Sequence, residues 1–325
     1  MKIWENAATF HLNLVCNPIR VLITGGTGLL GLNWAAALRD EHEVWLGTHR
    51  RQVSLRGARA VRLQLDSASG LARALADIRP DLVVHAAGLS NVDDCERDPA
   101  AALAVNAGLA GAVAAVAAER GLKLVHISTD HLFDGTRSMV TEADPPVPLN
   151  AYARSKLEGE RLVAERCPDA LIVRTNFFGW GHAARQSLSD WVLEGLRESR
   201  PRRMFADVFF TPILAQRLAR AVHDLLETRT AGLVHVSGDE RVSKHAFALR
   251  LAAVFGLSPA AITEGRYAEA GLAAPRPRDM SLSNARARGI LGRSLGGLDD
   301  FFAELRDQEA AGLGLEMRQA VAADH

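Results

Sequence analysis

Short apolar segments alternate along the chain with longer segments rich in alanine and leucine. The short segments contain many β-branched residues and are apolar along their whole length, as strands buried on both faces of a parallel sheet are. The longer segments have helical periodicity. Strands are predicted over residues 19–24, 42–48, 60–66, 80–87, 122–129 and 169–176. Because helices separate these strands, the pattern predicts an α/β fold with a doubly wound parallel sheet.

The alternation loosens after Phe177, where helices are predicted near 186–199, 213–228 and 244–256, with a strand over 232–238 and a rigid proline-containing loop over 274–284. We therefore expect a smaller C-terminal α/β portion that binds the substrate. The predicted organisation is an N-terminal extension 1–18, a nucleotide-binding domain 19–176, a mixed and mainly substrate-binding portion 177–308, and a frayed tail 309–325.

Composition excludes several classes of protein. The chain has 325 residues, 48% of them hydrophobic, and its 38 Lys and Arg residues balance its 38 Asp and Glu residues. No general field therefore attracts nucleic acid or an anionic membrane, and we expect neither as a partner. No apolar run is expected to reach the length of a membrane span. The three cysteines and eleven histidines fit no disulfide framework and no metal spacing, so we expect a cytoplasmic protein without a metal site.

A glycine-rich loop, "TGGTGLLG", joins the first strand to the first helix. Gly26, Gly28 and Gly31 satisfy the spacing G-x-G-x-x-G, which gives a tight turn, a close approach of the backbone to a pyrophosphate, and tight packing of helix against strand. The positive end of the helix favours the phosphates. We therefore predict a Rossmann-type dinucleotide site, in which the contact residues of this loop are Gly25, Thr27, Gly28, Leu29 and Leu30.

The second strand ends in His49, Arg50 and Arg51, where a site specific for NAD usually has an acid. Guanidinium groups suit the 2′-phosphate of NADP, which favours NADPH and leaves NADH possible; a solvated basic turn is the simpler alternative. Asp66 is a candidate to contact the adenine, or else a helix N-cap. The small-residue turn Ala86, Ala87 and Gly88 lets a ligand approach the backbone. Asn106 in the next helix has either a structural role, in which it ties the central strands together, or a catalytic one.

Tyr152 and Lys156 stand four residues apart in "NAYARSKLEGE", which places both on one face of a helix. A cation beside a phenol lowers the pKa of the phenol, so we expect Tyr152 to exchange a proton with a carbonyl oxygen near neutral pH. Lys156 is also placed to hold the ribose of the cofactor.

These motifs occur in an order that resembles the extended short-chain dehydrogenases/reductases, and within them the nucleotide-sugar reductases related to dTDP-4-dehydrorhamnose reductase. The resemblance covers about residues 19–300 and rests on "VLITGGTGLLG", "DLVVHAAGLSNVDDCERDP", "HISTDHLFDG", "NAYARSKLEGE", "LIVRTNFFG" and "RPRDMSLSN". It implies a catalytic set of Thr129, Tyr152 and Lys156, in which Thr129 binds the carbonyl that Tyr152 protonates. It further implies NAD(P)H as hydride donor, a nucleotide-linked 4-keto-6-deoxysugar as substrate, and a possible homodimer.

The substrate side has fewer signals. Candidate substrate-binding residues are Ser90, Asn91, His131, Asn176 and Arg276. Arginine suits phosphate, although an arginine flanked by prolines, such as Arg276 or Arg278, is often only an exposed loop charge. "RTNFFGW" departs from the Arg-Thr-Ser-Trp run common in the rhamnose enzyme.

Three other functions stay open. Related dehydratases carry a Thr-Asp-Glu run, whereas this chain has His131 after Thr129 and Asp130; histidine can act as a base, so elimination is not excluded. Epimerases also keep the tyrosine and the lysine. The third is a non-catalytic NADP-binding subunit, because the regulatory subunit of methionine adenosyltransferase resembles the same branch.

Overall fold

A seven-stranded parallel sheet forms the centre of the protein in a computed structural model, which describes residues 18–65 and 67–321. The strands follow the spatial order β11-β6-β5-β4-β1-β2-β3, and every neighbouring pair is parallel. Their bounds are β1 (Arg20–Thr24), β2 (Glu43–Thr48), β3 (Ala58–Arg62), β4 (Leu82–His85), β5 (Lys123–Ile127), β6 (Leu171–Arg174) and β11 (Gly232–His235). The order reverses between β1 and β4, where a doubly wound sheet opens a crevice for ligands.

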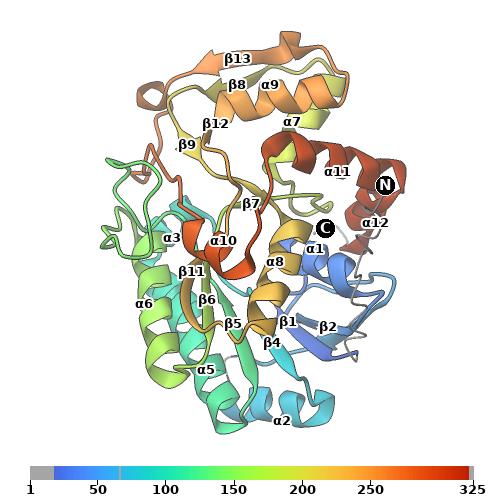
Figure 1. The fold of residues 1–325 in the computed structure, drawn as a ribbon, viewed down its shortest axis with the longest axis vertical. Helices are drawn as coiled ribbons and strands as arrows, with labels where there is room; N and C mark the ends of the chain where they lie inside the picture. Colours follow the sequence, from blue (N-terminus) through green and yellow to red (C-terminus); the bar gives the residue numbers. More distant parts are fainter. Residues whose placement is uncertain (1–17, 66, 322–325) are drawn as a thin grey trace, which may run out of the picture.

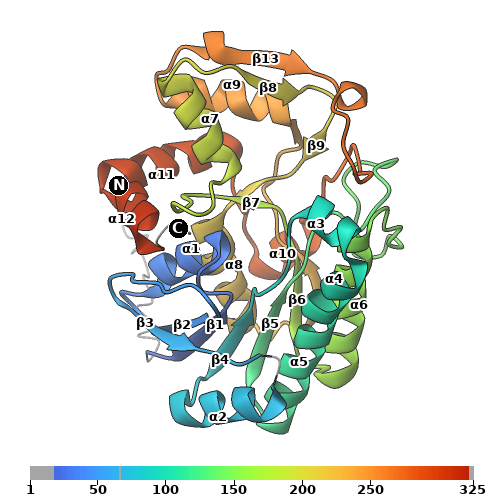
Figure 2. The ribbon, with the colours of Figure 1, turned by 180° about the vertical axis from the view of Figure 1, so that it is seen from behind.

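Helices cover both faces of this sheet (Figures 1 and 2). One layer contains α1 (Leu29–Leu38), α8 (Ala215–Glu227) and α10 (Ala285–Leu291), and the other contains α2 (Ala68–Ile78), α5 (Leu109–Glu119) and α6 (Ala151–Arg166). Successive side chains of a strand point to opposite faces. Val21 and Ile23 of β1 accordingly belong to one hydrophobic core and Leu22 to the other. The predicted doubly wound fold is confirmed.

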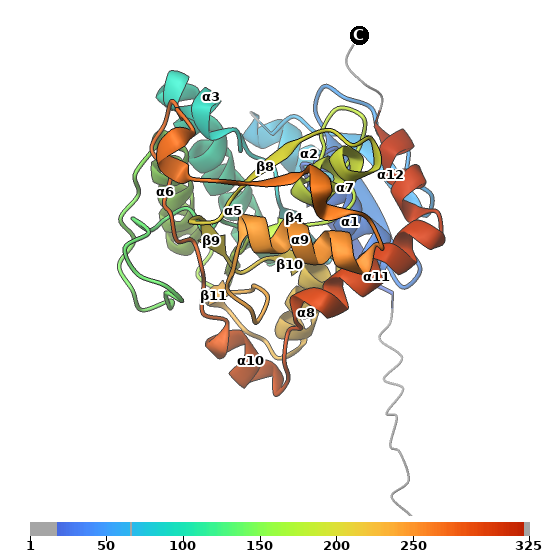
Figure 3. The same ribbon diagram turned by 90° about the horizontal axis from the view of Figure 1, so that it is seen from above.

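The C-terminal elements lie mostly above the carboxyl ends of the strands (Figures 1 and 3). Three short strand pairs join β8 (Arg202–Phe205) to β13 (Ile262–Gly265), β9 (Phe209–Phe210) to β12 (Val242–Ser243), and β7 (Phe177–Phe178) to β10 (Ile213–Leu214). The helical elements here are α7 (Leu188–Arg197), α9 (Lys244–Val254), η2 (Pro259–Ala261), η3 (Tyr267–Glu269) and α11 (Leu298–Ala310). Five phenylalanines pack against one another between these elements, most of them edge to face, and hold the elements together: Phe178, Phe210, Phe247, Phe301 and Phe302.

One helical segment corrects an expectation from the sequence. Helices α3 (Val92–Arg97) and α4 (Pro99–Leu103) precede a π-helical turn, η1 (Ala104–Gly108), which leads directly into α5. The segment Pro99–Glu119 is long and apolar enough to cross a membrane by length and composition, so the expectation that no apolar run reaches this length was wrong. Half of its apolar window is buried within the protein, and α5 packs against α6 and the sheet, as a core helix of a globular domain does.

The C-terminus provides a second correction. Residues 309–325 were expected to form a frayed tail, but α11 continues to Ala310 and is followed by α12 (Leu313–Ala320). Leu313, Met317 and Ala320 are buried because their spacing of three to four residues places them on one helical face. Glu316 forms a bidentate ion pair with Arg39 of α1, with distances of 2.5 and 2.9 Å. Except for Pro18, the predicted extension 1–18 lies outside the described residues.

Candidate active site

The glycine-rich loop forms a cradle that only glycine can build. Gly25 has φ +73°, and a Cβ atom on it would lie 2.8 Å from the Cα atom of Ala87. A Cβ atom on Gly31 would lie 2.7 Å from the carbonyl oxygen of Gly25, so the first turn of α1 packs directly on the loop. Gly28 caps α1 without a side-chain hydrogen bond, which leaves the amides of this helix end available to an anion. The loop therefore fits a dinucleotide pyrophosphate.

A cavity of about 1180 Å³ runs from this loop along the carboxyl ends of the strands to the C-terminal portion. Its wall contains the predicted cofactor residues Gly25, Thr27, Gly28, Leu29, Leu30, His49, Arg50, Arg51, Ala86, Ala87, Gly88 and Lys156. It also contains Thr129, Tyr152, Ser90, His131 and Asn176. The structure thus brings the predicted cofactor and catalytic residues together in one space. The prediction for Asp66 lies outside the described residues, and Ser67 caps α2 instead through its side chain.

Asn106 fixes the turn that follows β4. Its amide nitrogen donates to the carbonyl oxygen of Leu89 at 2.9 Å, and its side-chain oxygen accepts from the amide of Leu89 at 2.8 Å. The same amide nitrogen also donates to the Ser155 hydroxyl of α6 at 2.9 Å. Asn106 therefore ties the cofactor side of the cavity to the helix that carries Tyr152 and Lys156.

Helix α6 begins at its N-cap Asn150, whose side chain accepts a hydrogen bond from the amide of Ala153. Lys156 lies one turn after Tyr152, and its ammonium group donates to the carbonyl oxygen of Ile127, at the end of β5, at 2.6 Å. Burial lowers the pKa of Lys156 to about 8, against the effect of Glu160. The lysine is thus fixed in the cavity wall, one helical turn from Tyr152.

The pKa of Tyr152 differs from the expectation. Burial raises it to about 12, and a hydrogen bond with Thr129 only partly opposes this effect. The expected lowering by Lys156 was wrong for this state, because the ammonium group is directed to the carbonyl of Ile127. A phenol with this pKa keeps its proton at neutral pH, which suits a donor to a carbonyl oxygen. The hydrogen bond with Thr129 keeps the two side chains next to each other in the cavity wall.

Asp130 and His131 follow Thr129 in the wall. Asp130 is buried and accepts a hydrogen bond from the side chain of Asn176 at 2.6 Å. Burial raises the pKa of Asp130, whereas the charges of His131 and Lys244 lower it. Nε2 of His131 lies 4.0 Å from the Asp130 carboxylate, and the ring of His131 stands edge-on to Tyr152 with 5.7 Å between ring centroids. His131 therefore shapes the wall directly beside the proton donor.

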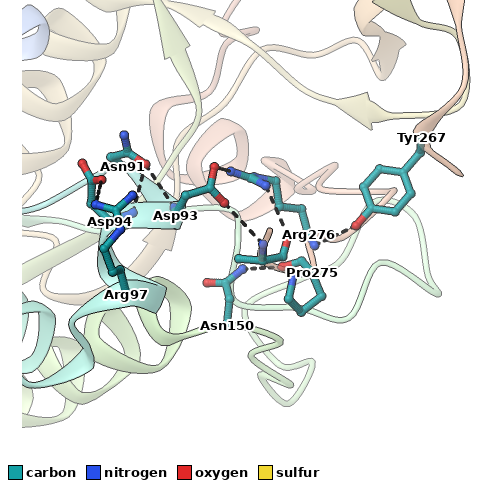
Figure 4. Close-up of polar contacts among 9 residues, drawn as sticks. Asn91, Asp93, Asp94, Arg97, Asn150, Tyr267, Pro275 and Arg276 are labelled. Atoms are coloured by element: carbon teal, nitrogen blue, oxygen red, sulfur yellow. Dashed lines mark hydrogen bonds and ion pairs between the residues drawn. The ribbon is translucent and has the colours of Figure 1, made fainter. Parts of the chain in front are cut away.

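Asn91 and Arg276 do not belong to the wall of this cavity. The side chain of Asn91 caps α3 by accepting hydrogen bonds from the amides of Asp93 and Asp94. The guanidinium of Arg276 pairs with Asp93 at 2.8 Å, and its backbone amide donates to the Tyr267 hydroxyl at 2.9 Å (Figure 4). This network, which also includes Asn150 and Pro275, fixes the proline-containing loop against α3.

Several wall residues were not identified from the sequence: Thr175, Arg185, Gln186, Ser187 and Leu188. The last four lead into α7, where Ser187 and Asp190 form a capping box. The spacing Ser-x-x-Asp is a helix-start signal that the sequence does contain. Its position over the cavity depends on tertiary packing, which no local pattern shows.

The sheet, the glycine loop and the Thr–Tyr–Lys set define a protein of the extended short-chain dehydrogenase/reductase class. The chain belongs to the RmlD substrate binding domain family, whose model matches residues 19–299. The resemblance drawn from the sequence is thereby confirmed.

Known proteins show the same relationship. The probable low-salt glycan biosynthesis reductase Agl14 of Haloferax volcanii is 32% identical over 290 residues, which cover 87% of this chain and 96% of the relative. The dTDP-4-dehydrorhamnose reductase of Burkholderia thailandensis is 35% identical over 254 residues, which cover 75% of this chain and 80% of the relative. The crystal structure of dTDP-4-dehydrorhamnose reductase from Bacillus anthracis in complex with NADP superimposes with a TM-score of 0.79 at 25% identity, covering 90% of this chain and 99% of that one.

A protein named as a subunit is also similar. Methionine adenosyltransferase 2 subunit beta of Rattus norvegicus is 33% identical over 263 residues, which cover 73% of this chain and 72% of the relative. Membership of the family therefore does not by itself distinguish an enzyme from a regulatory subunit, and this distinction depends on the residues of the site.

Proposed function

We propose that the protein uses NADPH to reduce the keto group of a nucleotide-linked 4-keto-6-deoxysugar. The observation that carries this proposal is the presence of Thr129, Tyr152 and Lys156 in one cavity with the glycine-rich cradle. Two relatives named as reductases of this chemistry, one of them solved with NADP, support the proposal.

Each residue of the site has a separate role in the proposed reaction. NADPH, when bound, supplies the hydride that goes to the carbonyl carbon. Tyr152 donates its phenolic proton to the carbonyl oxygen, so that the product is an alcohol, and regains a proton from solvent. Thr129 donates a hydrogen bond to the same oxygen. Lys156 would hold the ribose hydroxyl groups of the cofactor, and its positive charge would stabilise the phenolate that the proton transfer leaves behind.

The alternatives have less support. Elimination needs an acid and a base beside the threonine, but the place of the glutamate is taken by His131, whose Nε2 atom is directed to Asp130. A regulatory subunit would not require the complete catalytic set that this cavity holds. An epimerase that retains its cofactor uses the same tyrosine and lysine, and is distinguished by its product.

The direct test is NADPH consumption by the purified protein with dTDP-, UDP- and GDP-linked 4-keto-6-deoxysugars. We expect stoichiometric NADPH oxidation with at least one of them and a deoxysugar alcohol as product. Binding of NADPH without turnover of any sugar, together with capture of a large enzyme partner, would instead establish the regulatory subunit. The cytoplasmic location and the homodimer stay predictions. Cell fractionation tests the first and light scattering tests the second.

The preference for NADPH gives a separate prediction. Replacing both Arg50 and Arg51 by alanine should weaken NADPH binding by about 10- to 100-fold and leave NADH binding unchanged, because charge-assisted hydrogen bonds to the 2′-phosphate are lost. Fluorescence titration with both cofactors measures this. Arg59→Ala removes another exposed arginine nearby, outside the cavity wall, and serves as the control. Equal losses for NADPH and NADH would contradict the assignment.

The lowered pKa of Lys156 predicts that the affinity for NADPH depends on pH. Because its pKa is lowered to about 8, the ammonium group loses its proton as the pH rises through this value. The charged form is therefore present below pH 8, and we expect affinity for NADPH to fall between about pH 7 and pH 9 as the charge is lost. Titrations across this range should show the decline in the native protein and a flatter profile in Lys156→Met. Identical profiles would show that another group controls binding.

A further inference from the structure

A short hairpin, residues 181–187, lies between β7 and α7 in the chain, and its residues Arg185, Gln186 and Ser187 line the cavity. Gly181 and Ser187 both donate backbone hydrogen bonds to Asp190, at 2.6 and 3.0 Å. His182 and Arg185 form a pair of backbone hydrogen bonds, at 3.0 and 2.9 Å. The backbone of the hairpin is thus fixed at both ends, whereas the side chain of Arg185 is exposed and lines the cavity.

The partner of Arg185 is neutral. Its guanidinium donates to the hydroxyl of Ser90, which also lines the cavity, at 2.6 Å. Within residues 18–65 and 67–321 no carboxylate forms an ion pair with Arg185, whereas Arg276 pairs with Asp93 and Arg174 with Glu160. A guanidinium at a cavity wall without an anionic partner is suited to an anion from solution.

Arg185 lies in a different part of the cavity wall from the residues proposed to bind the cofactor phosphates. Among the described residues, the cavity wall has four arginines or lysines: Arg50, Arg51, Lys156 and Arg185. The first two lie after β2, at the adenosine end, and Lys156 is bound to Ile127. Arg185 is hydrogen-bonded to Ser90, which follows the turn after β4. The positive charge of Arg185 also lowers the pKa of the Tyr152 phenol, although this effect is small compared with that of burial.

The N-terminus of α7 does not offer a second positive site for an anion. Ser187 Oγ already accepts from the amide of Asp190, and the Asp190 carboxylate accepts from the amides of Gly181 and Ser187. An acid at this position offsets the positive end of the helix. An anion at this end of the cavity therefore meets Arg185 as its cationic contact.

We infer that Arg185 exchanges its hydrogen bond to Ser90 for the diphosphate of the bound nucleotide sugar, and so selects substrates that carry this group. This inference rests on the proposed function, since a diphosphate-linked sugar is the substrate that brings an anion next to Tyr152. Two phosphate oxygens match the two parallel donors of a guanidinium, and the release of Ser90 frees its hydroxyl for the sugar.

The test measures binding without turnover. Calorimetry of dTDP, UDP and GDP against the NADP-saturated protein compares the native chain with Arg185→Ala and Arg185→Lys. We expect Arg185→Ala to weaken the nucleoside diphosphate that the native protein binds best by about 10- to 100-fold, with Arg185→Lys in between. NADPH affinity should change by less than about twofold, since other residues hold that cofactor.

Arg73→Ala is the matched control, because it removes one exposed arginine from α2, outside the cavity wall. It should bind the nucleoside diphosphate as the native protein does. The inference is overturned if Arg185→Ala binds it equally well, if NADPH binding falls by the same factor, or if the native protein binds none of the three. A thermal melt shows whether each variant remains folded.

The two proposals fail separately. Loss of nucleoside diphosphate binding in Arg185→Ala, in a protein that reduces no ketosugar, would leave the anion site in place and remove the proposed reduction. Reduction of a ketosugar with an unchanged KM in Arg185→Ala would retain the reaction and remove the role of Arg185.

Discussion

Replacing Tyr152 by phenylalanine should lower kcat for ketosugar reduction by a factor of about 10² to 10⁴, which is the usual contribution of a positioned general acid. The variant keeps the ring and its contact with His131 but has no proton to give to the carbonyl oxygen. Burial raises the pKa of the Tyr152 phenol to about 12, so the phenol carries its proton throughout the neutral pH range. NADPH binding should stay within about twofold of the native value, since the cradle and Lys156 are unchanged.

The only other tyrosine, Tyr267, provides a matched control. Its hydroxyl accepts a hydrogen bond from the backbone amide of Arg276, away from the cavity wall (Figure 4). Tyr267→Phe therefore removes the same atom from a structural position, and kcat should remain within about twofold of the native value. Steady-state rates and NADPH titrations of both variants measure the difference. Near-native kcat in Tyr152→Phe would remove Tyr152 from the role of proton donor.

The sequence was most informative where function depends on local geometry. The glycine spacing predicts the cradle because a tight turn and a close helix leave no space for a Cβ atom at Gly25 or Gly31. Tyr152 and Lys156 lie on the same side of α6 because helical periodicity fixes this. These residues could be found from their spacing together with the order of the motifs along the chain, and the structure places them together with Thr129 in the cavity wall.

The sequence was least informative where a property or a position depends on contacts between distant segments of the chain. The pKa of Tyr152 is set mainly by burial, which the interval to Lys156 does not reveal. Arg276 was expected at the substrate, but Asp93, 183 positions earlier, pairs with its guanidinium. Arg185 belongs to no recognisable motif and reaches the cavity only because its hairpin is fixed to α7.

A buried ion pair fixes the helix that carries the catalytic residues. Glu160 lies one turn after Lys156 on α6 and binds Arg174 of β6 through two hydrogen bonds, at 2.9 and 2.7 Å. The side chains of Arg174 and Glu160 are only 4% and 8% exposed. Two ions so far from solvent are stable only as a pair, because either one alone keeps its full cost of desolvation.

Replacing Arg174 by methionine should therefore lower the free energy of unfolding by about 3–5 kcal/mol, the usual result of leaving one buried charge unpaired. Denaturant titration at neutral pH measures this loss. The double variant Glu160→Leu/Arg174→Met removes both charges and should recover most of the stability, because apolar side chains of similar size can replace a buried ion pair. A small loss in the single variant, or an equal loss in the double variant, would contradict this account. Recovery of the reaction rate together with stability would show that the pair acts by holding α6 against the sheet.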